Sequence, residues 1–392
     1  MRSGQTGNTR LAFNPTLDRI EKELASLRAR SLHRTLESMD GSNFCSNDYL
    51  ALSKHPDLVS AVREAIVPGE RVASTGSRLL SGHVDAWEEV EEEFADYVGA
   101  EASLFFNSGY AANIGVLTSI LRDGDIVFSD SANHASLIDG MRLSRVRKVI
   151  FPHLNLDALE DALRNEGHGG NERFIVSESL FGMDGDQASV SHLHGLADRY
   201  GASLIIDEAH ATGVLGKQGR GLVEDAGRPE SVLATIHTCG KALASAGAFV
   251  ACSKTLKDFL INRARTFVFS TALPPYMAVQ VRTALRIAKE SETDRAGLAA
   301  NARLLRDKIR EAGLDCGGSE SQIVPVMLGT SEDAVKIAAA LNTSGFAVRA
   351  IRPPTVPAGT ARLRLSLNVD IPPEIIHELV RGVVAAMGQV SQ

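Results

Sequence analysis

The sequence LIIDEAHATGVLGKQGRG, residues 204–221, places ionisable side chains directly after an apolar strand. Leu204, Ile205 and Ile206 are followed at once by Asp207, Glu208 and His210. Charged groups beside a buried strand end cost free energy unless a partner compensates them. The glycines at 213, 216, 219 and 221 are typical of turns. The stretch is therefore either a well-satisfied structural turn or one wall of a site that binds a charged ligand.

Strand-like and helix-like segments alternate around this stretch, from about residue 85 to 285. The strand-like runs are ASLFFNSG, DIVFSD, KVIFPH, RFIVSESLF, ASLIIDEA and AGAFVACS, and helical patterns occupy 85–98, 111–122, 155–165 and 190–200. Such alternation is typical of a largely parallel sheet with helices on both faces. We therefore predict an α/β fold with a large domain over residues 49–285.

The two ends of the chain have other patterns. An N-terminal arm, residues 1–48, contains a predicted amphipathic helix within 15–38, where helical spacing relates Leu17, Ile20, Leu24, Leu27 and Leu32. After residue 275, a long helical stretch from about 276 to 312 leads into a smaller α+β domain, residues 286–392, which ends in a helix near 372–388. The sequence thus predicts an arm followed by a large and a small domain.

The bulk composition excludes several classes of protein. A chain of 392 residues is too long for one small core, and its net charge of -7 gives no basic surface for nucleic acid or an anionic membrane. No apolar run approaches the roughly 20 residues that a membrane helix needs. The four cysteines are widely spaced and form no CxxC pair. We predict a cytoplasmic protein without a metal site and without a nucleic-acid or membrane partner.

Polar residues follow five of the predicted strands. They are Asn107 to Gly109, Asp130 to His134, Glu178 and Ser179, Asp207 to His210, and Thr238 to Lys241. Ligands of open α/β sheets bind at the carboxyl ends of the strands. These five strand ends therefore predict one shared site.

Lys241 is the residue in this set with the most specific chemistry. It lies between Gly240 and a run of small residues in HTCGKALASAGAFV, so it is either a solvated lysine at a turn or a partly desolvated amine that forms a Schiff base. Pyridoxal phosphate requires such a lysine, an acidic partner for its ring nitrogen and a phosphate cradle. Asp207 is a candidate for the acid. Ser108, Gly109 and Tyr110 are candidates for the cradle, where a helix is expected to begin at about Ala111.

Eight motifs, in order, resemble those of the α-oxoamine synthases, which are fold-type I pyridoxal-phosphate enzymes. They are NDYLALSKHP, NSGYAAN, NHASLIDG, MDGD, DEAHATGVLGKQGRG, TCGK, FSTALPP and IRPPTVPAGTARLRLSL, and the resemblance covers about residues 17–385. It implies a large domain with a mostly parallel sheet, a smaller α+β C-terminal domain, and a homodimer with sites at the subunit interface.

IRPPTVPAGTARLRL is most similar to the members of that family that act in biotin biosynthesis. The resemblance implies a decarboxylative condensation of L-alanine with a pimeloyl thioester, carried by coenzyme A or by acyl carrier protein. Two alternatives stay open. One is a glycine-using sister enzyme, such as a 2-amino-3-oxobutyrate ligase or a 5-aminolevulinate synthase. The other is a non-catalytic domain that only binds pyridoxal phosphate.

The resemblance also implies roles for the residues at the cofactor. Lys241 would form the Schiff base and then act as the base, and Asp207 would pair with the ring nitrogen. His134 would stack over the ring and His210 would bind its phenolic oxygen. Further cofactor contacts are implied for Ser108, Gly109, Tyr110, Glu178, Gly182 and Thr238, and for Ser270 and Thr271, which would reach the phosphate of the partner subunit.

Four residues are expected at the substrates. Arg364 would hold the substrate carboxylate in a charge-assisted pair, which suits a planar guanidinium, and Asn47 is a further candidate for substrate binding. Thr355 and Arg34, or His33 in an alternative register, would contact the acyl substrate.

Two positions differ from the family pattern. Gly182 in LFGMDGD stands where members usually carry a serine that contacts the phenolic oxygen, so His210 would make this contact alone or with a water. Trp87 stands where members often have histidine. Neither difference alters Lys241 or Asp207.

Overall fold

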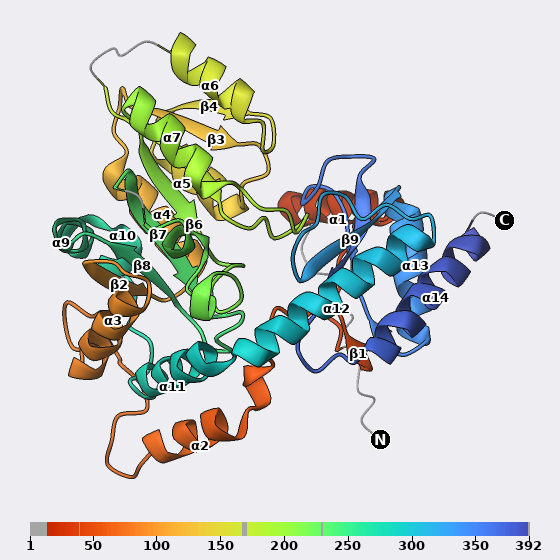
Figure 1. Ribbon diagram of the computed structural model, residues 1–392, viewed down its shortest axis with the longest axis horizontal. Helices are drawn as coiled ribbons and strands as arrows, with labels where there is room; N and C mark the ends of the chain where they lie inside the picture. The colour runs from red at the N-terminus through yellow and green to blue at the C-terminus, as the bar shows by residue number, and fades with distance from the viewer. Residues whose placement is uncertain (1–13, 39, 167–170, 229, 391–392) are drawn as a thin grey trace, which may run out of the picture.

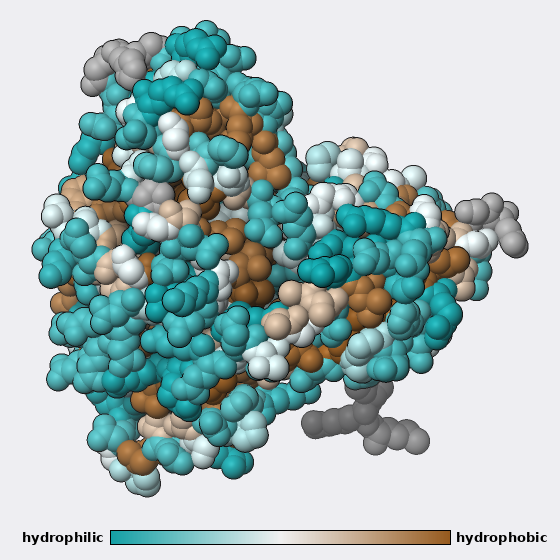
Figure 2. All heavy atoms as spheres, viewed as in Figure 1, coloured by the Kyte–Doolittle hydropathy of each residue, from teal (hydrophilic) through white to brown (hydrophobic). Residues whose placement is uncertain are grey.

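The computed structural model describes residues 14–38, 40–166, 171–228 and 230–390. Figure 1 shows a large lobe and a small lobe, with helix α12 (Glu292–Glu311) running from the first to the second. Figure 2 shows a mostly hydrophilic face, with a group of hydrophobic residues visible where the two lobes meet. Within the described ranges, no helix combines the length and the apolar character needed to span a bilayer.

A seven-stranded sheet forms the centre of the large lobe, in the order β2-β8-β7-β6-β5-β3-β4. Only β8 runs antiparallel to its neighbours, and the pairs among β7, β6, β5, β3 and β4 are parallel. The strands are β2 (Ala102–Phe106), β3 (Ile126–Asp130), β4 (Arg147–Phe151), β5 (Arg173–Glu178), β6 (Ser203–Asp207), β7 (Val232–Thr238) and β8 (Ala248–Cys252). This is the largely parallel sheet that the alternating sequence pattern predicts.

Helices cover both faces of this sheet because neighbouring side chains of a strand point to opposite faces. Ile205 packs with Ala112 of one helical layer, whereas Leu204 and Ile206 pack with Leu193 of the other. The first layer comprises α4 (Gly109–Ile120), α5 (Ala135–Leu143), α9 (Lys254–Arg263) and α10 (Arg265–Val268). The second comprises α6 (Leu156–Asn165), α7 (Val190–Tyr200) and α8 (Leu222–Asp225).

The small lobe is built on an antiparallel sheet in the order β11-β12-β9. Its elements are β9 (Ile323–Gly329), α13 (Ser331–Thr343), β10 (Phe346–Ala347), β11 (Ala350–Ile351), β12 (Ala361–Ser366) and α14 (Pro373–Val390). The short strand β1 (Ser42–Asn43) pairs in parallel with β10, so a segment from the start of the chain joins this lobe. The domain limits 1–48, 49–285 and 286–392 stay a prediction.

The remaining helices lie between or beside the lobes. α3 (Asp85–Tyr97) and α11 (Tyr276–Glu290) share one hydrophobic core with the small lobe, and α2 (Pro56–Ala65) packs on α11. The predicted helical stretch 276–312 is in fact two helices, because Ser291 leaves the helical conformation (ψ 40°) between α11 and α12. Two short 3-10 turns, η1 (Leu52–Lys54) and η2 (Lys217–Gly219), complete the described elements.

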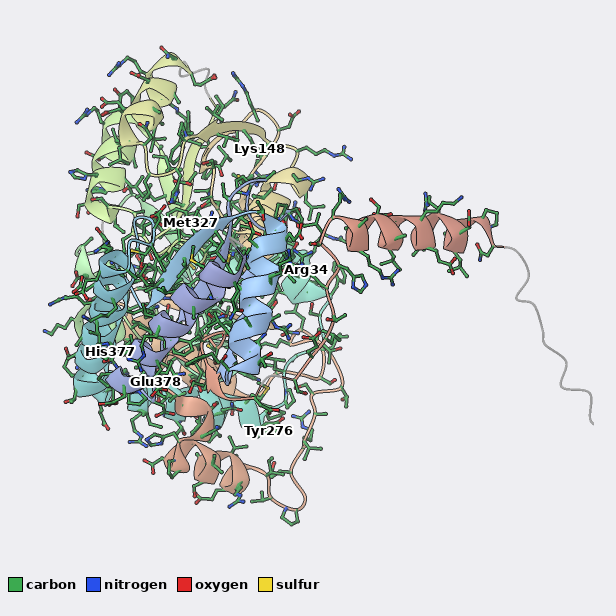
Figure 3. All side chains as sticks on the ribbon, turned by 90° about the vertical axis from the view of Figure 1, so that its right-hand side faces the viewer. Arg34, Lys148, Tyr276, Met327, His377 and Glu378 are labelled. Carbon is green, nitrogen blue, oxygen red and sulfur yellow. The ribbon has the colours of Figure 1, made fainter. Side chains whose placement is uncertain are left out.

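The N-terminal helix is shorter than the sequence predicts. α1 (Pro15–Ala29) begins at a cap in which Asn14 Oδ1 accepts from the backbone N–H of Thr16 at 3.0 Å. It ends before Ser31, whose positive φ (55°) breaks the helix, so the prediction of a helix through residue 38 is wrong. No residue of α1 is buried, and Figure 3 shows the helix extending away from the body of the chain.

Candidate active site

The polar strand ends lie together at one edge of the large sheet. β5 and β6 are neighbours in register, so Glu178 pairs directly with Asp207. The next strand, β7, ends at Thr238, and Lys241 follows within the turn that leads to β8. The shared site that the sequence predicts at this edge is thus assembled from three adjacent strands.

Asp207 is buried, with 5% of its surface exposed, and its carboxylate is held by two donors. Asn113 Nδ2 donates to Oδ2 at 2.7 Å, and the backbone N–H of Ala209 donates to Oδ1 at 2.8 Å. Asn113 Nδ2 also contacts the Ser136 hydroxyl at 2.8 Å. Sequence reasoning missed Asn113, although it is the last residue of the quoted motif NSGYAAN and lies one helical turn after Gly109.

Lys241 lies in a compact turn between β7 and β8. The turn is closed by backbone hydrogen bonds, among them Cys239 N–H to Gly247 O and Ala244 N–H to Lys241 O, both at 2.9 Å. Burial lowers the pKa of Lys241 to about 8, although the charges of Asp207 and Glu178 oppose this shift. Burial and the Asp207 charge together raise the pKa of Glu178 to about 8. The site therefore holds an amine that loses its proton more easily than an ordinary lysine.

The two predicted histidines both lie close enough to Lys241 for its charge to act on them. His134 caps α5, and its Nδ1 contacts the Ser136 hydroxyl at 2.7 Å and accepts from the Ser136 N–H. His134 is exposed in this structure. His210 is buried, and burial followed by the charges of Lys241, Arg364 and His134 hold its pKa well below the usual value. His210 is therefore a neutral imidazole.

Arg364 reaches the site from β12 of the small lobe. Its side chain is buried and donates through Nε to the carbonyl oxygen of Gly182, through Nη1 to the Ser366 hydroxyl at 2.7 Å, and through Nη2 to Asn47 Oδ1 at 3.1 Å. A guanidinium has five N–H donors, so part of its fork is still available to a carboxylate. The structure thus places Asn47, another residue expected at the substrate, in contact with Arg364.

The residues predicted to form the phosphate cradle lie at the start of α4. The helix begins at Gly109, two residues earlier than predicted, because the Ser108 hydroxyl caps it by accepting from the Ala111 N–H at 3.1 Å. The first N–H groups of a helix have no partner within it, which suits an anion. A Cβ at Gly109 would lie 3.5 Å from Thr238 Oγ1, so the threonine hydroxyl borders the same space. The Tyr110 side chain points away and donates to Asp139.

The residues expected at the partner subunit and at the acyl substrate lie further out. Thr271 is exposed, and its carbonyl oxygen accepts from Asn107 Nδ2 at 2.6 Å, next to the cradle. Ser270 precedes it after α10, and the roles of both residues toward a partner stay a prediction. Arg34 Nη2 donates to Pro353 O at 3.4 Å, beside the exposed loop that carries Thr355.

A cavity of about 590 Å³ lies between the N-terminal arm and the small lobe, and both candidate residues, His33 and Arg34, line it. Its other walls come from α13 and from the segment of β11, and Figure 3 places Arg34 where the arm rejoins the body. None of the residues around Lys241 lines it. The cavity is thus a separate space from the predicted cofactor site.

Comparison with known proteins decides the family. The description "Aminotransferase class I and II" matches residues 40–383. The 8-amino-7-oxononanoate synthase of Geobacter sulfurreducens is 45% identical over 365 residues, which are 89% of this chain and 92% of that protein. The chain belongs to this family of synthases, within the class I and II aminotransferases. It is a pyridoxal-phosphate-dependent acyltransferase of fold type I, which confirms the predicted fold class, enzyme class and cofactor.

Solved structures support the same placement. Serine palmitoyltransferase from S. paucimobilis, with a bound PLP-myriocin aldimine, has a TM-score of 0.88 and 27% identity, covering 96% of this chain and 98% of that one. The 8-amino-7-oxononanoate synthase of Francisella tularensis has a TM-score of 0.78 and 26% identity, covering 90% and 99%.

The donor set of this site fits pyridoxal phosphate. A carboxylate at Asp207 suits a protonated ring nitrogen, the uncapped N–H groups of α4 suit a phosphate, and a deprotonatable amine at Lys241 suits an aldehyde. The exposed imidazole of His134 suits an aromatic partner. Trp87, the other departure from the family pattern, is a core residue stacked on Phe105 with ring centroids 4.5 Å apart.

Proposed function

We propose that this enzyme condenses L-alanine with a pimeloyl thioester to form 8-amino-7-oxononanoate, carbon dioxide and a free thiol. The relatives with 40–45% identity that carry the name of this product support the proposal. The observation that carries it is the position of Lys241, a half-buried amine beside Asp207 and Glu178, with its pKa lowered to about 8.

The cofactor supplies an electron sink that stabilises negative charge on the α-carbon of the amino acid. Asp207 would keep the ring nitrogen protonated. Its carboxylate is buried and is held in one orientation by two hydrogen-bond donors. Lys241 takes the α-proton, because an amine with a pKa near 8 is partly neutral at physiological pH and a base works best near the operating pH. His134 would cover one face of the ring and His210 would donate to its phenolic oxygen.

Arg364 orients the amino acid by binding its carboxylate. Asn47 and the Gly182 carbonyl oxygen hold the guanidinium in place, so the α-carbon is presented to Lys241 in one orientation. Thr355 and Arg34 would bind the acyl chain, and Ser270 and Thr271 would complete the phosphate site of the partner subunit. The atoms balance: the α-carbon loses a proton to Lys241 and forms a bond to the thioester carbonyl carbon, and the thiolate leaves and takes up one proton. The alanine carboxyl group then leaves as carbon dioxide, and a proton takes its place on the α-carbon.

The test is turnover by the purified holoenzyme with L-alanine, glycine or L-serine, each offered with pimeloyl-coenzyme A and with pimeloyl-acyl carrier protein. We expect L-alanine to give 8-amino-7-oxononanoate, by mass spectrometry, and stoichiometric carbon dioxide and thiol. Comparing the two carriers assigns the acyl donor. Product from glycine alone would move the enzyme to the glycine-using sisters. Cofactor binding without carbon dioxide release from any pair would identify a non-catalytic domain.

A further inference from the structure

Tyr49 is a fully buried tyrosine next to the candidate active site, with no role in the chemistry described so far. It has 0% of its surface exposed. Its hydroxyl lies 2.7 Å from His210 Nδ1 and 3.1 Å from Asn47 Oδ1. A phenol has one proton to donate, so only one of these two contacts receives it. The choice determines which nitrogen of His210 carries hydrogen.

Three observations assign the tyrosine proton to His210. The contact with Nδ1 is the shorter one, and Asn47 Oδ1 already accepts from Arg364 Nη2 at 3.1 Å. Burial and the surrounding positive charges hold the pKa of His210 far below its usual value, so the ring carries a single N–H. If Nδ1 accepts from Tyr49, that single hydrogen lies on Nε2.

Gly182 determines what Nε2 faces. A Cβ built at Gly182 would lie 2.3 Å from His210 Nε2 and 2.8 Å from its Cδ2, so any side chain at 182 would displace the ring. Gly182 does not have a positive φ, so its backbone conformation is one that other residues adopt. The His210 ring can therefore occupy its position only because residue 182 has no side chain. Arg364 fixes this backbone by donating to the Gly182 carbonyl oxygen.

We propose that Tyr49 is a positioning residue that fixes His210 as the Nε2–H tautomer, and that Gly182 provides the space in which this N–H donates to the phenolic oxygen of the cofactor. Tyr49 and Gly182 together thus allow His210 to supply the hydrogen-bond donor that a serine at 182 would otherwise supply. The proposal rests on the proposed position of His210 beside the cofactor. What is new is that Tyr49 determines which nitrogen of His210 donates the hydrogen bond.

Tyr49→Phe removes the hydroxyl and keeps the ring. The matched control is Tyr97→Phe, a second buried tyrosine, 2% exposed, whose hydroxyl donates to Gln218 O at 2.8 Å away from the site. Nitrogen NMR of histidine-labelled holoenzyme distinguishes a protonated ring nitrogen from a bare one, and His210→Gln assigns the signal. In the parent and in Tyr97→Phe we expect a protonated Nε2 and a bare Nδ1. In Tyr49→Phe we expect a mixture of tautomers.

Two further readouts separate this proposal from a general loss of structure. The visible absorption of the bound cofactor responds to its phenolic oxygen, so its band is expected to shift in Tyr49→Phe and not in Tyr97→Phe. The value of kcat/KM is expected to fall roughly tenfold, the size of one hydrogen bond. Gly182→Ala, which leaves Tyr49 intact, is expected to move the His210 signals and the band as well, because the ring is displaced.

A protonated Nδ1 in the parent protein, or an unchanged tautomer in Tyr49→Phe, would overturn the proposal. The NMR result does not depend on which amino acid or thioester reacts. A failure of the substrate assignment therefore leaves the tautomer result intact, and the two failures can be told apart.

Discussion

The lowered pKa of Lys241 comes from its position in the fold and not from a residue next to it in the sequence. The turn between β7 and β8 withdraws its amine from water, and two carboxylates only partly offset this effect, so its pKa falls to about 8. An ordinary surface lysine has a pKa of about 10.4. The buried cluster therefore places a usable base at the end of the sheet.

Lys241→Ala tests this base. We expect the visible band of the covalently bound cofactor to disappear and turnover to fall by about 10²–10⁴-fold, the usual contribution of a general base. The control is Lys148→Ala, an exposed lysine of β4 that Figure 3 shows pointing away from the body, where both readouts should match the parent. A variant that kept the band and the rate would place the reactive amine elsewhere.

Sequence reasoning reaches the residues whose chemistry is local. Lys241 and Asp207 were found because each follows an apolar strand, and Arg364 because it lies in a quoted motif. Tyr49 and Asn113 were missed because their roles depend on partners that are 161 and 94 residues away in the chain. Tyr49 lies in NDYLALSKHP and Asn113 in NSGYAAN. The sequence therefore shows the residue types at these positions, but it does not show which distant residues they contact.

At the scale of elements, His153 connects the end of β3 to the turn that carries Gly182. Its Nδ1 contacts Asp130 Oδ1 at 2.8 Å and its Nε2 contacts Asp186 Oδ2 at 2.9 Å. Burial alone would lower the pKa of His153, but the hydrogen bonds and charges of the two aspartates raise it to about 10. This charged contact stabilises the turn beside His210.

The raised pKa predicts the pH dependence of that stabilisation. The folded-state pKa of His153 lies above its unfolded value of 6.5, so its contribution is complete below pH 6.5 and is lost as pH rises toward 10. We expect His153→Gln to reduce the free energy of unfolding by about 1–3 kcal/mol at pH 6, and by much less at pH 9.5, in urea titrations of both proteins.

His83→Gln is the control for this prediction. His83 also contacts a carboxylate, Glu88 at 3.0 Å, but 36% of the His83 side chain and 64% of the Glu88 side chain are exposed, so water screens this pair. Its effect should stay within about 0.5 kcal/mol at both pH values. An equal loss at pH 6 and pH 9.5 for His153→Gln would contradict a charged imidazole at 153.

The helix boundaries show how well the spacing of apolar residues predicts where helices begin and end. The predicted helices 85–98 and 190–200 agree with Asp85–Tyr97 and Val190–Tyr200. The break at Ser291 was missed because no glycine or proline marks it. Ser291 and Asp294 have the spacing of a capping box, a signal that could have indicated a new helix start. In the structure the Ser291 hydroxyl instead donates to Ile287 O at 3.0 Å.

At the scale of the whole molecule, the N-terminal helix lacks a partner in the chain described. Leu17 and Ile20 of α1 are 53% and 42% exposed, and Leu80 and Phe269 of the large lobe are also exposed, at 84% and 70%. An interface between subunits would remove such side chains from water. They support the proposed homodimer in which Ser270 and Thr271 serve the partner's phosphate site.

Subunit hybrids test the shared site. Lys241→Ala is combined by co-expression with the double variant Ser270→Ala/Thr271→Ala. If each site takes these hydroxyls from the other subunit, the mixed dimer has one complete site, and a statistical mixture should recover about a quarter of the parent activity. If each site uses its own Ser270 and Thr271, mixing restores nothing beyond the sum of the two variants.

The pairing of β1 with β10 has a consequence for how the protein is made. Ser42 and Asn43 pair with Phe346 and Ala347, and the Tyr49 carbonyl oxygen accepts from the Val369 N–H. Strand β1 and the segment after it can therefore form these contacts only once residues 346–369 have been synthesised. On the ribosome, the parallel sheet of the large lobe can emerge complete while the segment around Asn47 and Tyr49 is still without its partners. The candidate active site therefore cannot be complete until translation has passed β12.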